Sequence, residues 1–217
     1  MCDDQPKGTF YNRVFDYGPC RASAKVLFKT LLETLLLPLY MSRHSNLMPQ
    51  YPKLRCSPLS PPFTVVLVEP EIPPNTGSVA RTCAATKSPL CLIEPLGFRI
   101  DDQAVRRAGL DYWHLVDLHL HPSFEAFTRD NPQTRLHLFS SGSSRSYLDA
   151  DFRPGDALVF GRESVGLPRE LLAAYPDRVW AIPTSGEVRS INLSNAVAIV
   201  LYEALRRNHA LAPTFIK

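Results

Sequence analysis

Four small polar side chains are crowded into six residues between an expected strand and an apolar run. They are Ser190, Asn192, Ser194 and Asn195, and the apolar run 196–205 that follows is typical of a helix. A helix N-terminus presents unpaired N–H groups and the positive end of its dipole. One capping side chain is enough to begin a helix, so four of them indicate polar groups directed at a ligand. An over-supplied cap beside a loop explains the same pattern, and the spacing leaves both interpretations open.

A second polar cluster follows the expected strand 63–68. Two prolines stiffen its loop, and Asn75 is of the type that caps a helix. Arg81 falls about one and a half turns into the expected helix, away from its apolar stripe, and can reach into a cleft. The alternative is a surface arginine paired with Glu69 or Glu71. The spacing alone does not decide between them.

A glycine-rich segment, 161–168, follows the expected strand 157–160. Its G-x-x-x-x-G spacing resembles the start of a phosphate-binding loop, but Leu-Pro replaces the Lys-Ser/Thr that would hold phosphate and Mg²⁺. Gly161, directly beyond a strand, permits backbone contact with a flat ligand. Glu163 is expected either near the polar cluster 190–195 or as a carboxylate that merely flanks a helix.

Short apolar segments alternate with helical segments from residue 63 onward. We expect strands at 63–68, 90–93, 114–118, 135–139, 157–160 and 178–182. We expect helices at 76–86, 103–108, 123–129, 168–175 and 193–207. Continuously apolar strands that alternate with helices predict an α/β domain around a parallel sheet. Ligands of such sheets bind beyond the carboxyl ends of the strands, where the polar clusters fall.

Residues 1–62 differ in composition from the rest of the chain. They hold eight of the 20 prolines and carry eight Lys/Arg against four Asp/Glu. Segment 22–37 has the pattern of an amphipathic helix, and it is too short and too charged for a membrane span. We interpret 1–62 as an N-terminal extension, poorly ordered or accessory, and 63–217 as the functional domain. A targeting or partner-binding role of the extension stays open.

Charge and metal-ligand types restrict the function of segment 63–217. It carries sixteen Lys/Arg against seventeen Asp/Glu, so a broad cationic footprint for nucleic acid is missing. The five cysteines have no metal-ligand spacing and favour reduced thiols in a cytosol-like compartment. His119 and His121 share one face of a strand, but no third ligand is nearby. We therefore predict no metal site, and no membrane partner.

Three segments together resemble the three sequence motifs of the SpoU branch of the SPOUT RNA 2′-O-methyltransferases. They read NTGSVAR at 75–81, LVFGRESVGLP at 158–168, and Ile182-Pro followed by RSINLSNA at 189–196. The resemblance is closest to the small TrmL type, on LVEPEIPPNTG at 67–77, EPLGF at 94–98 and RRAGLDY at 106–112. It covers roughly residues 63–207, with the motifs in the expected order.

The resemblance implies a SPOUT fold, in which the C-terminal part of the α/β sheet threads a deep trefoil knot. It also implies S-adenosylmethionine as the methyl donor, held in that knot, and a homodimer with active sites at the interface. The cofactor-binding positions carried over from the family are Phe139, Gly161, Ile182, Ser190 and Leu193.

The implied reaction is methylation of the ribose 2′-OH of the wobble nucleotide, a cytidine or uridine at position 34 in the anticodon stem-loop of certain tRNAs. The family assigns Arg81 to activation of that hydroxyl. Because arginine stays charged, we favour stabilisation of the developing alkoxide over base catalysis. Glu163, Ser190, Asn192 and Asn195 complete the catalytic set by orienting the reacting groups. Tyr202 would serve the dimer interface, or be an ordinary core tyrosine.

Since the domain carries no overall positive charge, the implied tRNA binding needs a local patch, for which we expect Arg106, Arg107, Arg145, Arg162 and Arg189. The same reaction on another tRNA nucleotide or on rRNA is an alternative, and so is a catalytically silent RNA-binding protein that keeps the fold. The expected location is cytoplasmic, with organellar targeting by the extension left open.

Overall fold

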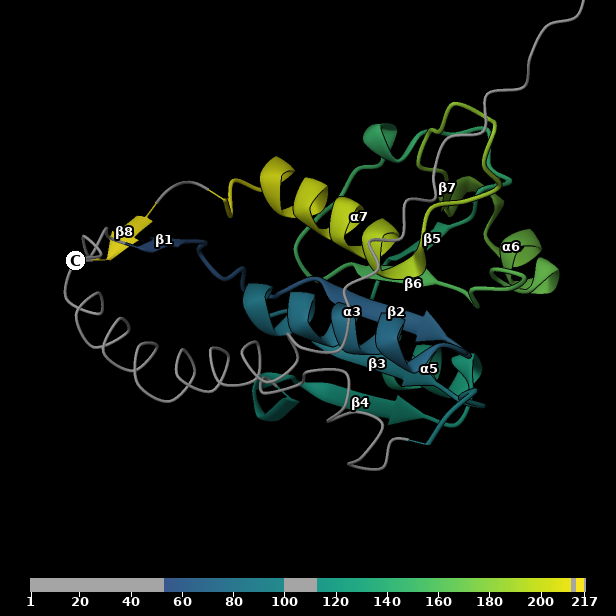
Figure 1. The fold of residues 1–217 in the computed structure, drawn as a ribbon, viewed down its shortest axis with the longest axis horizontal. Helices are drawn as coiled ribbons and strands as arrows, with labels where there is room; N and C mark the ends of the chain where they lie inside the picture. The colour runs from purple at the N-terminus through teal and green to yellow at the C-terminus, as the bar shows by residue number, and fades with distance from the viewer. Residues whose placement is uncertain (1–52, 100–112, 212–213, 217) are drawn as a thin grey trace, which may run out of the picture. The chain divides into compact units, whose positions relative to one another are not determined.

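A six-stranded parallel sheet forms the centre of the described part of the chain. The computed structural model describes residues 53–99, 113–211 and 214–216. The sheet has the order β4-β3-β2-β6-β5-β7 (Figure 1). Its strands are β2 (Thr64–Val68), β3 (Leu90–Ile93), β4 (Leu118–His121), β5 (Leu136–Phe139), β6 (Ala157–Phe160) and β7 (Val179–Trp180), and neighbouring strands pair in parallel.

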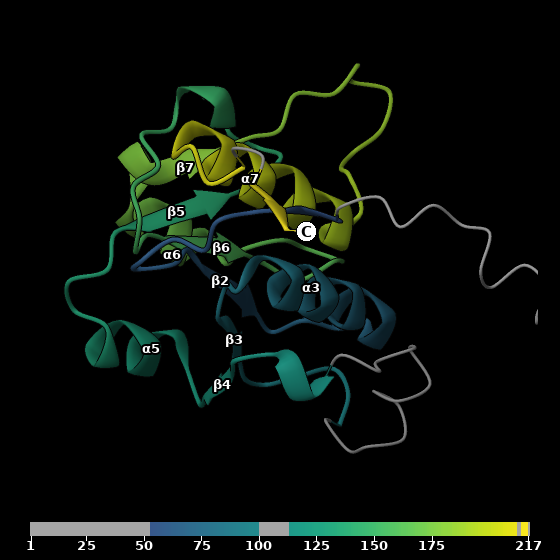
Figure 2. The ribbon, with the colours of Figure 1, turned by 90° about the vertical axis from the view of Figure 1, so that its left-hand side faces the viewer.

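Helices cover both faces of this sheet. They are α3 (Pro73–Thr86), α5 (Phe124–Asp130), α6 (Arg169–Ala174) and α7 (Leu193–Arg207), with short 3₁₀ turns at Trp113–Leu115, Tyr147–Asp149 and Pro176–Arg178. Figures 1 and 2 show α3 and α7 side by side on one face and α5 and α6 on the other. Two separate apolar clusters fill the space between the sheet and its two helical layers.

The inner strands β2, β3, β5 and β6 are buried almost throughout, as an apolar run between two helical layers requires. In β2, Val65 and Leu67 pack towards α3 and α7, whereas Val66 and Val68 pack towards the other layer. This alternation follows from the period of two along a strand. The inner strands therefore form a rigid platform whose carboxyl ends carry the candidate site.

A topological switch point lies between β2 and β6, which are neighbours in the sheet. After β2 the chain passes through α3 to β3 on one side, and after β6 it passes through α6 and on to β7 on the other side. The two loops at the carboxyl ends of β2 and β6 therefore diverge. Such divergence opens the crevice in which α/β sheets bind ligands.

The expected parallel α/β architecture is confirmed, with one strand misplaced. The strand expected at 114–118 is wrong, because Trp113–Leu115 is a 3₁₀ turn and β4 spans Leu118–His121. As an edge strand, β4 tolerates the polar side chains of His119 and His121. Helix α3 begins at Pro73, earlier than expected, because proline is well accommodated in the first turn of a helix.

The expected helices at 22–37 and 103–108 lie outside the described residues, and the domain boundary at residue 63 stays a prediction. Before that position, β1 (Lys53–Arg55) pairs antiparallel with β8 (Thr214–Ile216). The N–H of Ser57 also donates to the carbonyl of Ala210 at 2.9 Å. Among the residues that the structure describes, no helix combines the length and apolarity needed to cross a bilayer.

Candidate active site

The loop after β6 folds back on itself as a tight hairpin. The N–H of Arg162 donates to the carbonyl of Gly166 at 3.2 Å, and the reverse bond measures 2.9 Å. Gly166 has a φ of +75°, which favours glycine. A Cβ on Gly161 would lie 2.2 Å from the backbone nitrogen of Leu167. Gly161 is therefore needed for the return of its own hairpin, whereas the sequence interpretation explained it by a flat ligand alone.

The carboxylate of Glu163, in this hairpin, binds the loop that leads into α3. One oxygen accepts from the N–H of Glu71 at 2.9 Å. The other accepts from the N–H of Ile72 at 3.3 Å and from Nδ2 of Asn75 at 2.9 Å. Ile72 occupies the N-cap position of α3 and has no side chain that can cap. Glu163 thus supplies acceptors for backbone N–H groups of the loop and joins the ends of β2 and β6.

Asn75 connects that carboxylate to the last helix. It lies in the first turn of α3 and does not cap the helix, so this expectation was wrong. Its side-chain oxygen accepts from Nδ2 of Asn192 at 3.0 Å. Asn192 caps α7, and its Oδ1 accepts from the N–H groups of Ser194 and Asn195 at 3.0 and 3.4 Å. The chain Glu163–Asn75–Asn192 therefore links all three segments that the sequence singled out.

Two further carboxylates tie the loop after β2 to the hairpin. Glu71 accepts from the N–H of Ser164 at 3.1 Å and from its hydroxyl at 2.9 Å. Glu69 forms an ion pair with Arg162. Glu69 also has a φ of +52°, a strained conformation for a residue with a side chain. Arg189 donates to the carbonyl of Ser164 at 3.0 Å and so brings the loop before α7 to the same place.

Arg81 lies on the exposed face of α3, as the sequence predicted. Val79, Ala80 and Cys83 of the same helix are fully buried against the sheet. The alternative interpretation, a pairing of Arg81 with Glu69 or Glu71, stays beside the functional one; these carboxylates also bind Arg162 and Ser164 respectively.

The apolar residues of the expected cofactor set belong to the buried core. The ring of Phe139, at the end of β5, stacks on Phe160 with ring centroids 4.8 Å apart. Phe139 and Leu193 are buried, and Ile182 packs against the same apolar cluster. Ser190 is exposed and takes no part in the hydrogen bonds described above. Phe139, Leu193 and Ile182 of the expected cofactor set thus belong to one large apolar cluster. Glu163, Asn192 and the N–H of Asn195, of the expected catalytic set, belong to one series of hydrogen bonds.

This arrangement fits a nucleoside donor with a charged amino-acid tail. Apolar side chains suit the faces of an adenine ring, and the exposed polar groups at the start of α7 suit the ribose and the tail. Asn192 remains exposed although its amide already makes several hydrogen bonds, so the polar end of the site is open to solvent.

The expected RNA-binding arginines have protein partners where they are described. Arg145 donates to the carbonyl of Asp177 and lies 4.1 Å over the ring of Trp180. Arg162 and Arg189 belong to the hairpin contacts given above. The remaining two, Arg106 and Arg107, lie outside the described residues.

The two histidines of β4 contact acidic side chains. Nε2 of His119 lies 2.9 Å from Asp117, and Nδ1 of His121 lies 3.5 Å from Asp130. The ring of His121 also packs edge-on against Phe127. Within residues 53–99, 113–211 and 214–216, no group of three metal-ligand side chains comes together.

A model of the SpoU rRNA methylase family matches residues 62–202. The chain belongs to the SpoU methylase family. This match confirms the resemblance carried by the three motifs, which all lie within residues 62–202. It also places the polar chain from Glu163 to Asn192 inside the family's shared domain.

Curated SpoU relatives are similar over most of their own length. A tRNA (cytidine(34)-2′-O)-methyltransferase of Acidovorax sp. (strain JS42) is 47% identical over 154 residues, which are 70% of this chain and 95% of the relative. The protein of the same name from Burkholderia cenocepacia (strain HI2424) is 47% identical over 148 residues, 67% of this chain and 95% of the relative.

Solved SpoU structures share the fold. One, described as "Structural insights into the 2-OH methylation of C/U34 on tRNA", is 49% identical with a TM-score of 0.65, over 68% of this chain and 96% of that one. An AdoMet-bound rRNA methyltransferase from Sinorhizobium meliloti is 26% identical with a TM-score of 0.61, over 70% of this chain and 61% of that one.

Sequence reasoning missed the roles of Glu69, Glu71 and Ser164, and took Asn75 for a cap. The available signal was the pair of glutamates directly after one buried strand, together with the glycine-rich segment directly after another buried strand. The partner of Glu71 in the hairpin, Ser164, lies 93 residues further along the chain. Nothing in the local sequence indicates which distant loop such carboxylates bind.

Proposed function

We propose that this chain transfers the methyl group of S-adenosylmethionine to the ribose 2′-OH of the wobble nucleotide, a cytidine or uridine at position 34, of certain tRNAs. The curated relatives bear the name of that activity and are covered almost whole by the similarity. The observation that carries the proposal is the hydrogen-bonded chain Glu163–Asn75–Asn192, which joins the three family motifs at the switch point.

The chemistry asks mainly for positioning and charge stabilisation. A ribose hydroxyl is a weak nucleophile that must lose its proton and line up with the methyl group of the donor. The guanidinium of Arg81 stabilises the negative charge that develops on the 2′-oxygen. Glu163 holds the loop that begins α3 and thereby the helix that carries Arg81. S-adenosylmethionine supplies an activated methyl group when bound.

The chain's other residues hold the donor and the ribose in place. Phe139, Ile182 and Leu193 present apolar surface to the adenine, and Gly161 contacts it through its backbone. Asn192 keeps the first turn of α7 capped, so the N–H groups there are already oriented. Ser190 and Asn195, both exposed, are left to contact the donor's tail and the ribose.

A homodimer completes the site in this proposal. The outer face of α7 exposes Tyr202 to 45% and Ile199 to 36%, so Tyr202 is not an ordinary core tyrosine. Val165, at the tip of the hairpin, is 73% exposed and Ile72 is 44% exposed. Apolar side chains exposed around a polar site are typical of an interface. Sedimentation of the full chain as a monomer at micromolar concentration would contradict it.

The trefoil knot and the compartment are further parts of the proposal. Near the end of α7, Asn208 donates to the carbonyl of Phe152 at 3.1 Å, which supports close packing of the segment before β6 against this helix. The cysteines that the structure describes, Cys56, Cys83 and Cys91, are free thiols. They support a reducing, cytosol-like location for a tRNA-modifying enzyme.

Transfer of labelled methyl groups tests the activity directly. The full chain is incubated with radiolabelled S-adenosylmethionine and either total tRNA or rRNA, and the modified nucleotide is mapped. We expect label in tRNA, at the ribose of position 34. Label only in rRNA, or at another tRNA position, identifies the same reaction on a different substrate. Donor binding without transfer to any RNA would favour the catalytically silent alternative.

A further inference from the structure

A loop of exposed residues joins the end of β7 to the start of α7. All of its residues from 183 to 190 are exposed. Figure 2 shows it as an open arch between β7 and α7. Its two ends are fixed, because Ile182 packs against the apolar core and Leu193 is buried. The middle of the loop therefore depends on polar contacts for its position.

Arg189 ties this loop to the hairpin after β6. Its Nη2 donates to the carbonyl of Ser164 at 3.0 Å. Within the loop, the N–H of Gly186 donates to the hydroxyl of Thr184 at 3.3 Å, which forms only a local turn. The guanidinium thus connects the loop to a segment 25 residues earlier in the chain. Because this hydrogen bond is charge-assisted but exposed to water, it is weak enough to open and close.

Ser164, which receives this contact, is itself held by Glu71. The carboxylate of Glu71 accepts from the N–H of Ser164 at 3.1 Å and from its hydroxyl at 2.9 Å. The N–H, the hydroxyl and the carbonyl of Ser164 are therefore all engaged at once. A carbonyl fixed in this way presents its oxygen to Arg189 in one direction, so the position of the loop depends on the position of Glu71.

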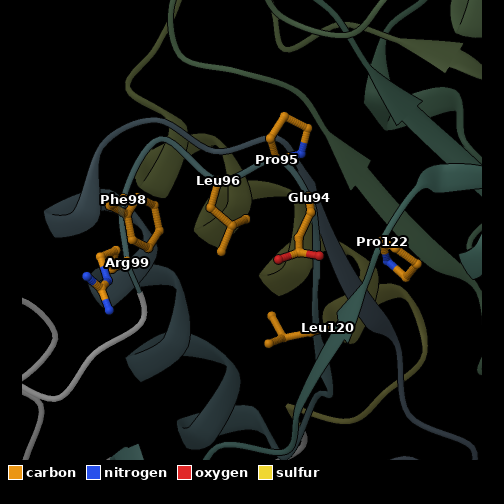
Figure 3. A pocket seen from close by; sticks show the side chains of 7 residues that line it. All are labelled: Glu94, Pro95, Leu96, Phe98, Arg99, Leu120 and Pro122. Atoms are coloured by element: carbon orange, nitrogen blue, oxygen red, sulfur yellow. The ribbon is translucent and has the colours of Figure 1, made fainter.

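The backbone of Glu71 is a firm anchor for this chain of contacts. Its N–H donates to Glu163 at 2.9 Å. On the neighbouring strand, the N–H of Gly97 donates to the carbonyl of Pro70 at 2.9 Å, and a Cβ on Gly97 would lie 2.7 Å from Cα of Glu71. Other residues of the segment 94–99 line the separate hollow shown in Figure 3. The chain that starts at the loop therefore ends on closely packed backbone.

Two chains of hydrogen bonds thus join the same three segments. The inner chain, from Glu163 to Asn192, runs through a buried asparagine. The outer chain, from Glu71 to Arg189, runs through the exposed Ser164. A buried chain stays formed in the folded state, whereas an exposed one exchanges its bonds with water. Opening of the outer chain releases the loop while the inner chain keeps the rest of the site in place.

We propose that Arg189 is a positioning residue of the donor site, which holds the loop 183–190 closed on the hairpin so that Ser190 meets S-adenosylmethionine. The inference rests on the proposed function, in which Ser190, Ile182 and Leu193 contact that donor. Ser190 directly follows Arg189, so the contact to the hairpin fixes its backbone as well. This role differs from the RNA contact that the sequence predicts for Arg189.

Calorimetric titration of the full chain with S-adenosylmethionine, without RNA, measures the Kd of the donor. The apparent Kd rises as the closed fraction falls, so we expect a rise of about fivefold in Arg189→Gln. Arg189→Lys keeps a charged hydrogen-bond donor and should recover part of the affinity. The control is Arg129→Gln, which removes an exposed charge from α5 and should leave the Kd unchanged. An unchanged donor Kd with a raised KM for tRNA in Arg189→Gln overturns the inference, because it makes Arg189 an RNA contact.

Cleavage by a glutamate-specific protease reports on the loop without donor or RNA. The loop contains Glu187, two residues before Arg189, and proteolysis follows the population of the open form. We expect cleavage after Glu187, identified by fragment mass, to be several-fold faster in Arg189→Gln than in the unaltered chain or in Arg129→Gln. An unchanged rate of cleavage overturns the inference, and so does faster cleavage with an unchanged donor Kd.

Methyl transfer separates this inference from the proposed function. At saturating donor, Arg189→Gln should keep its kcat within about twofold, because the bound donor then holds the loop closed. If the donor Kd and the cleavage rate change as expected but no RNA is methylated, the inference stands and the proposed function fails. If the unaltered chain binds no S-adenosylmethionine, both fail.

Discussion

Polar side chains gather at both ends of the parallel strands. The two clusters differ in how far their hydrogen-bonding groups are already occupied. At the amino-terminal edge, the side chain of Asp156 is only 4% exposed. It accepts from Arg135, from Nε2 of His137 and from the N–H of Arg153, at 2.7 to 2.9 Å. Burial opposes ionisation, but these hydrogen bonds outweigh it and lower the pKa of Asp156 to about 2.

At the carboxyl edge, the cluster of Glu163, Asn75 and Asn192 is only partly enclosed. Asn75 is buried, but Asn192 is exposed and Glu163 is half-buried. A saturated, enclosed carboxylate has no capacity left for a substrate, so the Asp156 cluster stabilises the fold. A connected but open cluster keeps its geometry while its outer groups remain available. The difference teaches that openness, rather than the number of hydrogen bonds, distinguishes the candidate site from the enclosed Asp156 cluster.

The largest effect is expected for Arg81→Ala. Removal of one preorganised donor to a developing oxyanion lowers turnover by roughly 10²- to 10³-fold. We expect a loss of that size in single-turnover transfer of labelled methyl groups, with donor binding unchanged in calorimetric titration. The control is Arg129→Ala, which removes an exposed arginine from a different helix, α5. Transfer at the parental rate in Arg81→Ala would refute the role given to this guanidinium.

Asp156→Asn should mainly lower the free energy of unfolding, whereas Glu163→Gln should mainly lower the rate of methyl transfer. Removal of the charge of Asp156 leaves Arg135 without its buried partner, and we expect a loss of about 3 kcal/mol in the free energy of unfolding. Glu163→Gln, at a half-exposed site, should lose about 1 kcal/mol but transfer methyl groups far more slowly. Urea unfolding and transfer assays at low temperature measure both. Equal stability losses in the two variants would erase the distinction between the clusters.

The pH dependence of stability sharpens the same comparison. The pKa of Asp156 is about 2 in the folded chain, below its ordinary value of 3.8. The folded state therefore binds fewer protons, and the stabilisation by this carboxylate is present above about pH 4 and lost as the pH falls towards 2. We expect it to supply about 2 kcal/mol of the acid-labile stability. About half of this stabilisation is lost at pH 3, so urea unfolding at pH 6 and pH 3 should show a change in the free energy of unfolding that is smaller by about 1 kcal/mol in Asp156→Asn.

The smallest effect is expected for loss of the hydrogen bond between the side chains of Asn75 and Asn192. Asn75→Ala and Asn192→Ala each break the same bond, so each should slow methyl transfer by about tenfold. The double variant should be slower by clearly less than the product of the two single losses. The bond that the two amides share is lost only once, whereas the contacts of Asn75 with Glu163 and of Asn192 with the first turn of α7 are lost separately. A fully multiplied, roughly hundredfold loss in the double variant would show that the two amides act independently.

Much of the fold followed from local pattern. The strands at 90–93 and 157–160 and the helix at 193–207 have the predicted bounds, because continuous apolar runs and clear caps mark them. The error at 114–118 arose where an edge strand carries alternating histidines and its apolar signal is weak. Periodicity describes burial, and an edge strand is only partly buried.

The candidate site was predicted in its residues more than in its connections. Glu163 and Asn192 were singled out as polar groups in the segments that follow strands, and the structure connects them through the side chain of Asn75. Asn75 was taken for a cap because asparagine in the first residues of a helix commonly caps it. Its actual partners come from loops that local pattern cannot place next to it.

The sequence by itself determined that polar side chains follow buried strands and that their motifs belong to one family of methylases, because residue type and short-range spacing carry that information. Only the tertiary structure decided that Asn75 bridges partners 88 and 117 residues away. The strand order that puts β2 beside β6 results from packing helices on both faces of one sheet. Each strand would look the same in the sequence under a different order, so the order becomes known only when the chain is folded.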